Sequence, residues 1–431
     1  MAIQIGKHYQ SMLGVDILVE KELGAGGQGI VYRVKYGGKP KALKVYKPAG
    51  LGSDPKAFYS NLKENVENGS PSSLFLWPTD MLDWTDGTFG YIMDLIPEEY
   101  HGLARFMNAK VHFASVRVAV DAALNIISAF RILHNRGYSY QDLNDGNFFL
   151  DATNGDVLIC DNDNVAPHGT HTGIMGEPRY MAPEIVRGEK MPDTYTDRYS
   201  LSVILFIILT NSHPLEGKRF LVDCLTDDLA KVLYGDQPIF VMDPGDKRNA
   251  PVHGIHRNLE LVWPELPTYL KDAFIKEFSY EVMMNPQKRT RETEWQKIFM
   301  RFRSNIVHCS CGNDILEAVP NVKKCPACGR GLQTYETLEL SGCDYVYPAI
   351  GGNDIRREQL GTSSVEAAND VVIKIRQKKD DPTVRIMQNV SGKEITCITP
   401  SGKRKAVPNM TMVPLKSGLQ LVVDNNKLTV K

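Results

Sequence analysis

The feature that most constrains the fold is an ordered series of polar residues, each placed beside an apolar run. Lys44 lies in the strand-like segment KALKV, and Asp161 follows the apolar run VLIC. Between them, Asp142 and Asn147 lie five positions apart in YSYQDLNDGNFFLD. An ammonium group, two acids and an amide at one site can together hold phosphate oxygens, a hydroxyl group and a divalent cation. The fold is therefore expected to bring these distant segments together.

A glycine cluster precedes the lysine. Gly24-Ala25-Gly26-Gly27-Gln28-Gly29, followed by Val31, matches the G-x-G-x-x-G-x-V pattern, in which a hairpin backbone approaches nucleotide phosphates without obstruction by side chains. Taken alone, the cluster is more typical of an ordinary glycine-rich hairpin. Lys44 follows Gly29 by 15 residues on the next predicted strand, and this spacing favours the phosphate-binding interpretation.

The sequence pattern predicts a small mixed segment followed by a larger helical one. Residues 16–46 alternate apolar and polar positions, which predicts strands around the glycine loop. Residues 57–68 carry a helical apolar stripe, and we expect Glu64 or Glu67 on this helix to hold Lys44. We prefer Glu64, because Leu62 two residues before it supplies the inward contact. From about 110 to 300 the pattern is mainly helical.

Three further motifs follow in order. GEPRYMAPE contains Ala182-Pro183-Glu184, Asp197 opens the apolar helix around 199–210, and Arg289 lies in NPQKRTR. Arg289 is expected to pair with a buried Glu184, since a buried charge needs a partner.

On these motifs, residues 16–303 resemble a protein kinase of the eukaryotic-like Ser/Thr type. The resemblance implies a two-lobed fold, with an N-lobe at about 1–95 and a C-lobe at about 96–303, that uses ATP with Mg²⁺ or Mn²⁺. It implies that Asp142 is the catalytic acid/base, that Lys44 and Glu64 position phosphates, that Asn147 and Asp161 bind the metal, and that Asp197 braces the catalytic loop. The residues implied to contact ATP are Gly24, Gly26, Gly29, Val31, Ala42, Lys44, Met93, Asp94, Ile96 and Phe149, with Leu23 beside them.

The implied activity is transfer of the ATP γ-phosphoryl group to Ser/Thr hydroxyls of a protein substrate, including autophosphorylation. Positions that depart from the family pattern include Gln141, Asn144, Asn162, Asp163 and Glu177. Gln141 stands where an arginine usually receives an activation-loop phosphate, and Asp163 replaces a glycine. Two alternatives therefore remain open, a nucleotide-binding pseudokinase scaffold and a small-molecule phosphotransferase.

A second constellation consists of cysteines. Cys309 and Cys311 are followed, after thirteen residues, by Cys325 and Cys328, and a glycine follows each pair. Four thiolates on two tight turns favour a tetrahedral Zn²⁺ site of structural type, similar to a zinc ribbon. His308 is an alternative metal ligand in place of one thiolate.

The end of the chain has short Val/Ile/Thr-rich runs separated by Gly, Asn and Asp, which predicts strands. The expected fold is thus α+β: the two-lobed kinase-like domain over 1–303, a zinc ribbon over 304–340, a linker or long loop over 341–370, and a small all-β domain over 371–431. The last domain is similar to a forkhead-associated β-sandwich, although that family's arginine and Ser-x-x-His phosphothreonine contacts are absent from the sequence.

The charge balance limits the classes of partner. The 50 Lys and Arg residues nearly equal the 51 Asp and Glu residues, so we expect neither nucleic acid nor a membrane surface as a partner. No apolar run has the length of a membrane span, and a cytoplasmic location is expected. By its resemblance to bacterial kinases of tellurium-resistance-linked operons, the chain is expected to act with a metal-dependent phosphatase and a von Willebrand-type protein.

Overall fold

The computed structural model describes residues 3–52, 54–170, 176–317, 322–361, 364–378, 380–381 and 383–431. The chain divides into two compact units, each of which is described by itself. The first contains residues 1–114, 132–260 and 274–290. The second contains residues 115–131, 261–273 and 291–431. The division between the units therefore differs from the expected 303/304 boundary, because three segments expected in the catalytic domain belong to the second unit.

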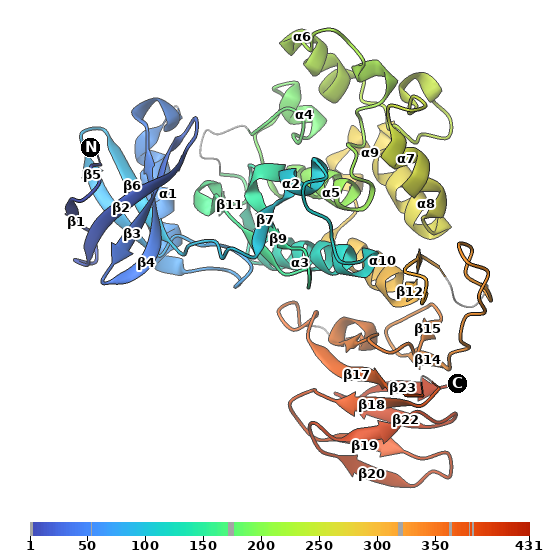
Figure 1. Cartoon of the computed structure of the whole chain (residues 1–431). Helices are drawn as coiled ribbons and strands as arrows, with labels where there is room; N and C mark the ends of the chain where they lie inside the picture. Colours follow the sequence, from blue (N-terminus) through green and yellow to red (C-terminus); the bar gives the residue numbers. More distant parts are fainter. Residues whose placement is uncertain are drawn as a thin grey trace. The chain divides into compact units, whose positions relative to one another are not determined.

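The first unit begins with an antiparallel sheet of order β1-β2-β3-β4-β6-β5 (Figure 1). Its strands are β1 His8–Gln10, β2 Asp16–Ala25, β3 Gly29–Tyr36, β4 Lys39–Tyr46, β5 Asp80–Thr85 and β6 Thr88–Met93. Helix α1, Pro55–Asn68, follows β4, and the Asp54 side chain caps it by accepting from the Ala57 amide. Phe58 and Leu62 of α1 are fully buried in one apolar cluster with Tyr46 and Phe89, so the helix is held by its apolar face.

The helical part of the chain follows. The helices are α2 Leu103–Met107, α3 Val116–Asn135, α4 Pro183–Val186, α5 Thr194–Thr210, α6 Asp227–Ala230, α7 Arg257–Val262, α8 Thr268–Glu277, α9 Tyr280–Met283 and α10 Glu292–Asn305. Helix α5 is buried on nearly every side, as its run of apolar residues requires. Asp193 and Thr196 form a capping box that fixes where α5 begins.

Short strands between these helices shape the candidate site. They are β7 Tyr100–Gly102, β8 Tyr138–Ser139, β9 Phe148–Asp151, β10 Val157–Ile159 and β11 Ala166–Pro167. Strands β10, β9 and β7 form one small sheet, and β8 pairs with β11. The loop between β8 and β9 carries Asp142 and Asn147, while Asp161 follows β10.

The second unit contains a short hairpin and two larger sheets. The hairpin pairs β12 Val307–His308 with β13 Asp314–Ile315. The larger sheets have the orders β15-β14-β23-β22-β19-β20 and β16-β17-β18-β21. Their strands are β14 Thr337–Leu340, β15 Tyr347–Pro348, β16 Ile355–Arg356, β17 Val371–Gln377, β18 Arg385–Asn389, β19 Ile395–Ile398, β20 Arg404–Val407, β21 Met412–Pro414, β22 Gln420–Val423 and β23 Asn426–Val430.

The interpretation of 341–370 as a linker or long loop was wrong for the described residues of that segment. β15 and β16 lie within it, and Tyr347, Ala349, Ile355 and Leu360 are buried in the same apolar core as the later strands. β14, expected inside the ribbon segment 304–340, pairs with β23 at the other end of the sequence. The β-domain therefore begins at about Thr337. Residues 318–321 and 362–363 lie outside the described part.

Charged side chains of the second unit join helix α3 to helix α10 and to residues 356 and 358. Asp121 on α3 accepts from Arg303 on α10 at 2.5 Å and from Arg356 on β16 at 3.2 Å. Arg131 on α3 pairs with Glu358 at 3.1 Å. All five side chains are at most 15% exposed, so these are mostly desolvated interactions.

Among the described residues, no helix combines the length and the apolar character that a bilayer crossing requires.

The corrected boundary of the β-domain can be tested with Ile355→Ala. Ile355 is 0% exposed, and truncation of a buried aliphatic side chain costs about 2–5 kcal/mol of unfolding free energy. We expect a clear drop in the midpoint of the calorimetric unfolding transition. The matched control is Val346→Ala, since Val346 is 46% exposed and should have little effect. Equal, negligible effects of both substitutions would support the linker interpretation.

Candidate active site

The site is built around the ammonium group of Lys44. Lys44 pairs across the sheet with Val31 on β3 and with Tyr91 on β6, so strand register fixes its position. Its Nζ donates to Asp163 Oδ2 at 2.9 Å, Asp161 Oδ1 at 3.1 Å and Gln28 Oε1 at 3.1 Å. Burial alone would lower the pKa of Lys44, but the carboxylates of Asp163 and Asp161 outweigh burial and raise it. The lysine is therefore charged.

The glycine loop covers this region. Gly29 requires the absence of a side chain, because a Cβ atom there would lie 2.4 Å from the carbonyl oxygen of Val45. A Cβ atom at Gly24 or Gly26 would meet no atom within 4 Å. Lys47 Nζ donates to the Gly26 carbonyl at 2.7 Å, which ties the loop to the end of the lysine strand.

The loop that carries Asp142 is held by a buried aspartate. Asp197, at the start of α5, accepts from the backbone amide of Tyr140 at 2.6 Å and from that of Gln141 at 3.0 Å. Gln141 has a φ of 75°, an unusual conformation for a residue with a side chain, which these bonds stabilise. Asn147 Nδ2 donates to the Asp142 carbonyl at 2.6 Å and so closes the loop. Asp197 thus occupies the position expected of a bracing residue.

The electrostatic environment of Asp142 is unusual for a carboxyl group. Burial raises the pKa of Asp142 to about 7, and the nearby carboxylates of Asp161 and Asp163 contribute to the rise. Its Oδ1 accepts from Asn144 Nδ2 at 3.3 Å and its Oδ2 from Asn164 Nδ2 at 3.4 Å. A carboxyl group that titrates near neutrality is suited to accept a proton from a bound hydroxyl group.

The segment after β10 contains two of the residues that depart from the kinase pattern, Asn162 and Asp163. Asp161 has φ 53° and ψ 46°, so it turns the chain sharply. Asn162 is fully buried and donates from Nδ2 to the carbonyls of Leu76 and Ile159, both at 2.9 Å. Asp163 is also fully buried, and its Oδ2 accepts from Lys44 and from the Tyr46 hydroxyl. The substituted residues are therefore anchored by polar bonds.

The expected pairing of Lys44 with Glu64 is absent, and so is the alternative with Glu67. Both glutamates are exposed on α1, and Asn65 is buried between them. Residues two apart on a helix point to different sides, so an inward Leu62 places Glu64 away from the sheet. Asn65, three residues after Leu62, faces inward instead and donates to the Val165 carbonyl at 2.7 Å.

The expected adenine-side residues gather in one apolar cluster. It includes the buried Ala42, Met93 and Cys160, and the half-buried Val31, Ile96 and Phe149 pack against it. Leu23 is 47% exposed. Asp94 is exposed and forms an ion pair with Lys41.

A cavity of about 520 Å³ joins the glycine loop to the catalytic loop. It is lined by Gly26, Gly27, Gln28, Gly29, Val31, Lys44, Asp142, Asn144, Gly146, Asn147, Asp161, Gly176 and Glu177. The predicted residues Lys44, Asp142, Asn147 and Asp161 thus meet at one site.

The sequence did not identify Gln28 and Asp163 as partners of Lys44. Their only signals were a polar residue within the glycine loop and an extra acid two residues after Asp161.

Ion pairs fix the segment that follows the site. Arg289 donates to Glu184 with two bonds, of 2.8 and 2.6 Å, which confirms the predicted pair.

His213 is buried, its Nδ1 accepts from the Leu215 amide at 3.1 Å, and its Nε2 lies 2.8 Å from the Arg179 carbonyl. This arrangement requires a neutral ring with its proton on Nε2.

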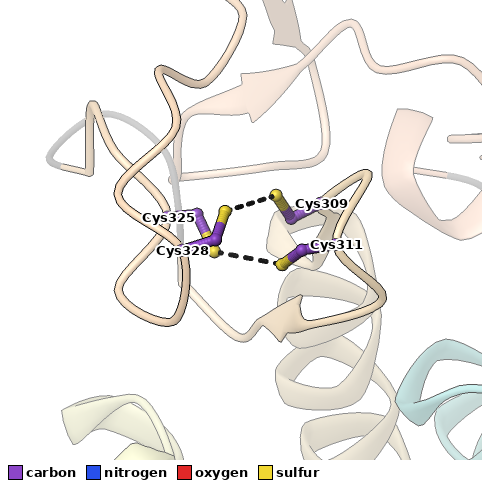
Figure 2. Close-up of side chains that lie close together, drawn as sticks. All are labelled: Cys309, Cys311, Cys325 and Cys328. Atoms are coloured by element: carbon purple, nitrogen blue, oxygen red, sulfur yellow. Dashed lines mark hydrogen bonds between the residues drawn. The ribbon is translucent and has the colours of Figure 1, made fainter.

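The four predicted cysteines of the second unit also meet (Figure 2). The Sγ atoms of Cys309 and Cys328 lie 3.7 Å apart, as do those of Cys311 and Cys325, and all four sulfurs lie within 4.8 Å of one another. The glycine after each pair, Gly312 and Gly329, has a positive φ that allows the turn. His308 is exposed and bonds to Asp314, so it lies outside this four-sulfur group.

Comparison with known proteins bears directly on the first site. Residues 17–226 match the family model described as "Protein kinase domain". Nearly half of the chain is thus similar to protein kinase domains. This kinase-like domain contains the glycine loop, Lys44, the catalytic loop and Asp161.

The relatives are similar to part of the chain. Human calcium/calmodulin-dependent protein kinase type IV is 30% identical over 217 residues, which cover 47% of this chain and 42% of that protein. Human protein kinase C eta type is 25% identical over 243 residues, or 55% and 34% of the two chains. The matches thus span less than half the length of these curated relatives. The solved kinase domain of Mycobacterium tuberculosis PknI is 19% identical, with a TM-score of 0.45, over 70% of this chain and 99% of that one.

The buried His213 predicts a pH dependence of stability. Burial lowers its folded-state pKa from 6.5 to about 4, so the unfolded chain binds a proton more readily. Its contribution to the unfolding free energy is complete above pH 6.5. It is lost as the pH falls toward 4, by up to about 1.4 kcal/mol per pH unit.

Thermal unfolding midpoints measured between pH 4 and 7 test this expectation. His213→Gln should flatten the profile in this range, whereas His253→Gln, whose side chain is 97% exposed, should not. A profile of His213→Gln that is parallel to the native one would contradict the assignment of the neutral ring.

Proposed function

We propose that the protein is an ATP-dependent kinase that transfers the γ-phosphoryl group to Ser/Thr hydroxyls of proteins, including its own. One observation carries the proposal: Lys44, Asp142, Asn147 and Asp161 line a single cavity beneath a glycine loop. These are the groups that phosphoryl transfer requires for phosphate, hydroxyl and metal. The match of residues 17–226 to the protein kinase domain supports the same chemistry.

The reaction follows from the roles of these side chains. The acceptor hydroxyl oxygen forms a bond to the γ-phosphorus, and the bond from that phosphorus to the bridging oxygen breaks, so that ADP leaves with the electron pair. The carboxylate of Asp142 takes the hydroxyl proton. Lys44 holds phosphate oxygens, and the backbone of the glycine loop covers the nucleotide. Catalysis then rests on positioning and on stabilisation of charge.

The donor set fits a divalent cation. Asp161 presents a carboxylate whose side chain is 38% exposed, and the bond from Asn147 Nδ2 to Asp142 commits the NH₂ end of that amide and leaves its acceptor oxygen for a cation. Hard oxygen ligands of this kind suit Mg²⁺ or Mn²⁺. When bound, the cation neutralises phosphate charge. Asn147 and Asp161 would hold it.

The four cysteines support a structural zinc ion as a second part of the proposal. A tetrahedral site with Zn–S distances of about 2.3 Å puts sulfurs about 3.8 Å apart, close to the separations of 3.7 Å between Cys309 and Cys328 and between Cys311 and Cys325. Four protein ligands leave no open coordination position, so the ion would stabilise the fold and take no part in phosphoryl transfer.

The kinase proposal predicts that Asp142→Asn lowers phosphoryl transfer by about 100-fold or more, because the acceptor hydroxyl loses its proton acceptor. Purified protein is incubated with labelled ATP and Mg²⁺ or Mn²⁺, and both protein-bound label and ATP consumption are followed. ATP binding by calorimetry should persist in the variant. Asp156→Asn, which changes an exposed loop carboxylate outside the cavity, serves as the matched control.

Two results would contradict the proposal. Unchanged transfer by pure Asp142→Asn would remove this residue from the mechanism. Tight ATP binding by the native chain without label or ATP consumption, under either metal and with protein acceptors supplied, would favour a nucleotide-binding scaffold.

The zinc proposal predicts about one zinc ion per chain by elemental analysis of the purified protein. Cys325→Ala should lose the ion and lower the unfolding midpoint, because it removes a buried ligand and binding energy contributes to folding. The control is Cys224→Ala, an exposed cysteine outside the group. Native protein free of zinc, or full zinc content in Cys325→Ala, would overturn the assignment.

A further inference from the structure

Asp163 is the most completely buried acid near the nucleotide cavity. Its side chain is 0% exposed, and that of Lys44 is 6% exposed. Lys44 Nζ and Asp163 Oδ2 are 2.9 Å apart, and the Tyr46 hydroxyl donates to the same oxygen. A carboxylate removed from water in this way is tolerated only beside a cation and hydrogen-bond donors, and Lys44 and Tyr46 supply both.

Asp161 and Asp163 differ in their access to the cavity. The Asp161 side chain is 38% exposed and lines the cavity, whereas the Asp163 side chain is 0% exposed and does not line it. A cation that enters the cavity can therefore meet Asp161 directly. Asp163 stays paired with the lysine, because separating the two side chains would remove a buried charge from its opposite charge.

Backbone anchors hold Asp163 on both sides. Asn162 donates to the carbonyls of Leu76 and Ile159. On the other side, Asn61 and Asn65 of α1 donate to the Val165 carbonyl at 2.8 and 2.7 Å. Helix α1 therefore acts on the lysine indirectly, by fixing the segment that carries Asp163. Its own glutamates at 64 and 67 are exposed.

We infer that Asp163 is the positioning residue of Lys44, in the role that the sequence pattern assigned to Glu64. This inference rests on the proposed kinase function and deepens it. Lys44 stays at the phosphate-binding position through a carboxylate from its own active-site loop, and Asp161 is left for the metal. The extra acid in Asp161-Asn162-Asp163 thus compensates for a helix that presents no inward carboxylate.

A double-mutant cycle between Lys44→Met and Asp163→Asn tests the coupling. Asp163→Asn should lower kcat by about tenfold or more while the KM for ATP changes by less than about threefold, because misplacement of the lysine affects the transition state most. If Asp163 acts through Lys44, the double variant should be no slower than Lys44→Met. Asp228→Asn on α6 is the surface control. Rates that multiply independently in the double variant would overturn the inference.

A parallel cycle on unfolding midpoints does not depend on catalysis. Each single substitution removes the ion pair but leaves the other buried group in place, and it should lower the midpoint, whereas the double variant should recover part of the loss. Additive losses would contradict the pairing. If the midpoints of the variants are coupled but the native chain transfers no phosphate, the kinase proposal is contradicted and the pairing of Lys44 with Asp163 is supported.

The rival partner is tested in the same assays. Glu64→Gln should change neither kcat nor the unfolding midpoint appreciably, since Glu64 is exposed. A loss of kcat in Glu64→Gln that disappears in the Lys44→Met background, with no such coupling for Asp163→Asn, would return the role to the helix.

Discussion

The candidate site of the first unit depends on the buried ammonium group of Lys44. Lys44 brings one positive charge into a space that it shares with Asp161 and Asp163, and the side chains of Lys44 and Asp163 are only 6% and 0% exposed. The pairing joins strand β4 to the segment that follows β10, two parts of the chain separated by more than a hundred residues. The Tyr46 hydroxyl donates to Asp163, and the side-chain amide of Asn65 on α1 donates to the Val165 carbonyl, which completes this polar core. The nucleotide cavity is thus one exposed face of a larger polar network.

The catalytic loop shows how a buried acid can impose backbone geometry. Asp197 accepts from two successive backbone amides, and Gln141, which supplies the second of them, adopts a positive φ that it would otherwise avoid. Gln141 also donates to Ser139 and to the Thr170 carbonyl, so its amide takes part in local bonds. The change from arginine at this position replaces a group suited to a phosphate with one suited to backbone groups.

Residue order and spacing predicted much of the candidate site. Lys44, Asp142, Asn147 and Asp161 meet in one cavity, Arg289 pairs with Glu184, and the four cysteines converge. The Glu64 prediction failed because it took neighbouring helix positions to share a face. Only the helical phase, in which Asn65 follows Leu62 by three residues, identifies the inward side. The role of Asp163 could not be predicted, since it depends on how deeply the segment after β10 is buried.

The boundary of the β-domain was mispredicted for a different reason. β15 and β16 are two residues long each, too short to show an alternating pattern, and their burial comes from strands much later in the chain.

The ion pairs of helix α3 in the second unit limit how the chain can be shortened or recombined. Asp121 and Arg131 on helix α3 find their charged partners on α10 and beyond it, at Arg356 and Glu358. A chain cut after α10 would keep the pair of Asp121 with Arg303, but Asp121 would lose Arg356 and Arg131 would lose Glu358. The C-terminal strands are thus part of the packing of this helix, and a modular exchange of the β-domain would have to bring matching charges with it.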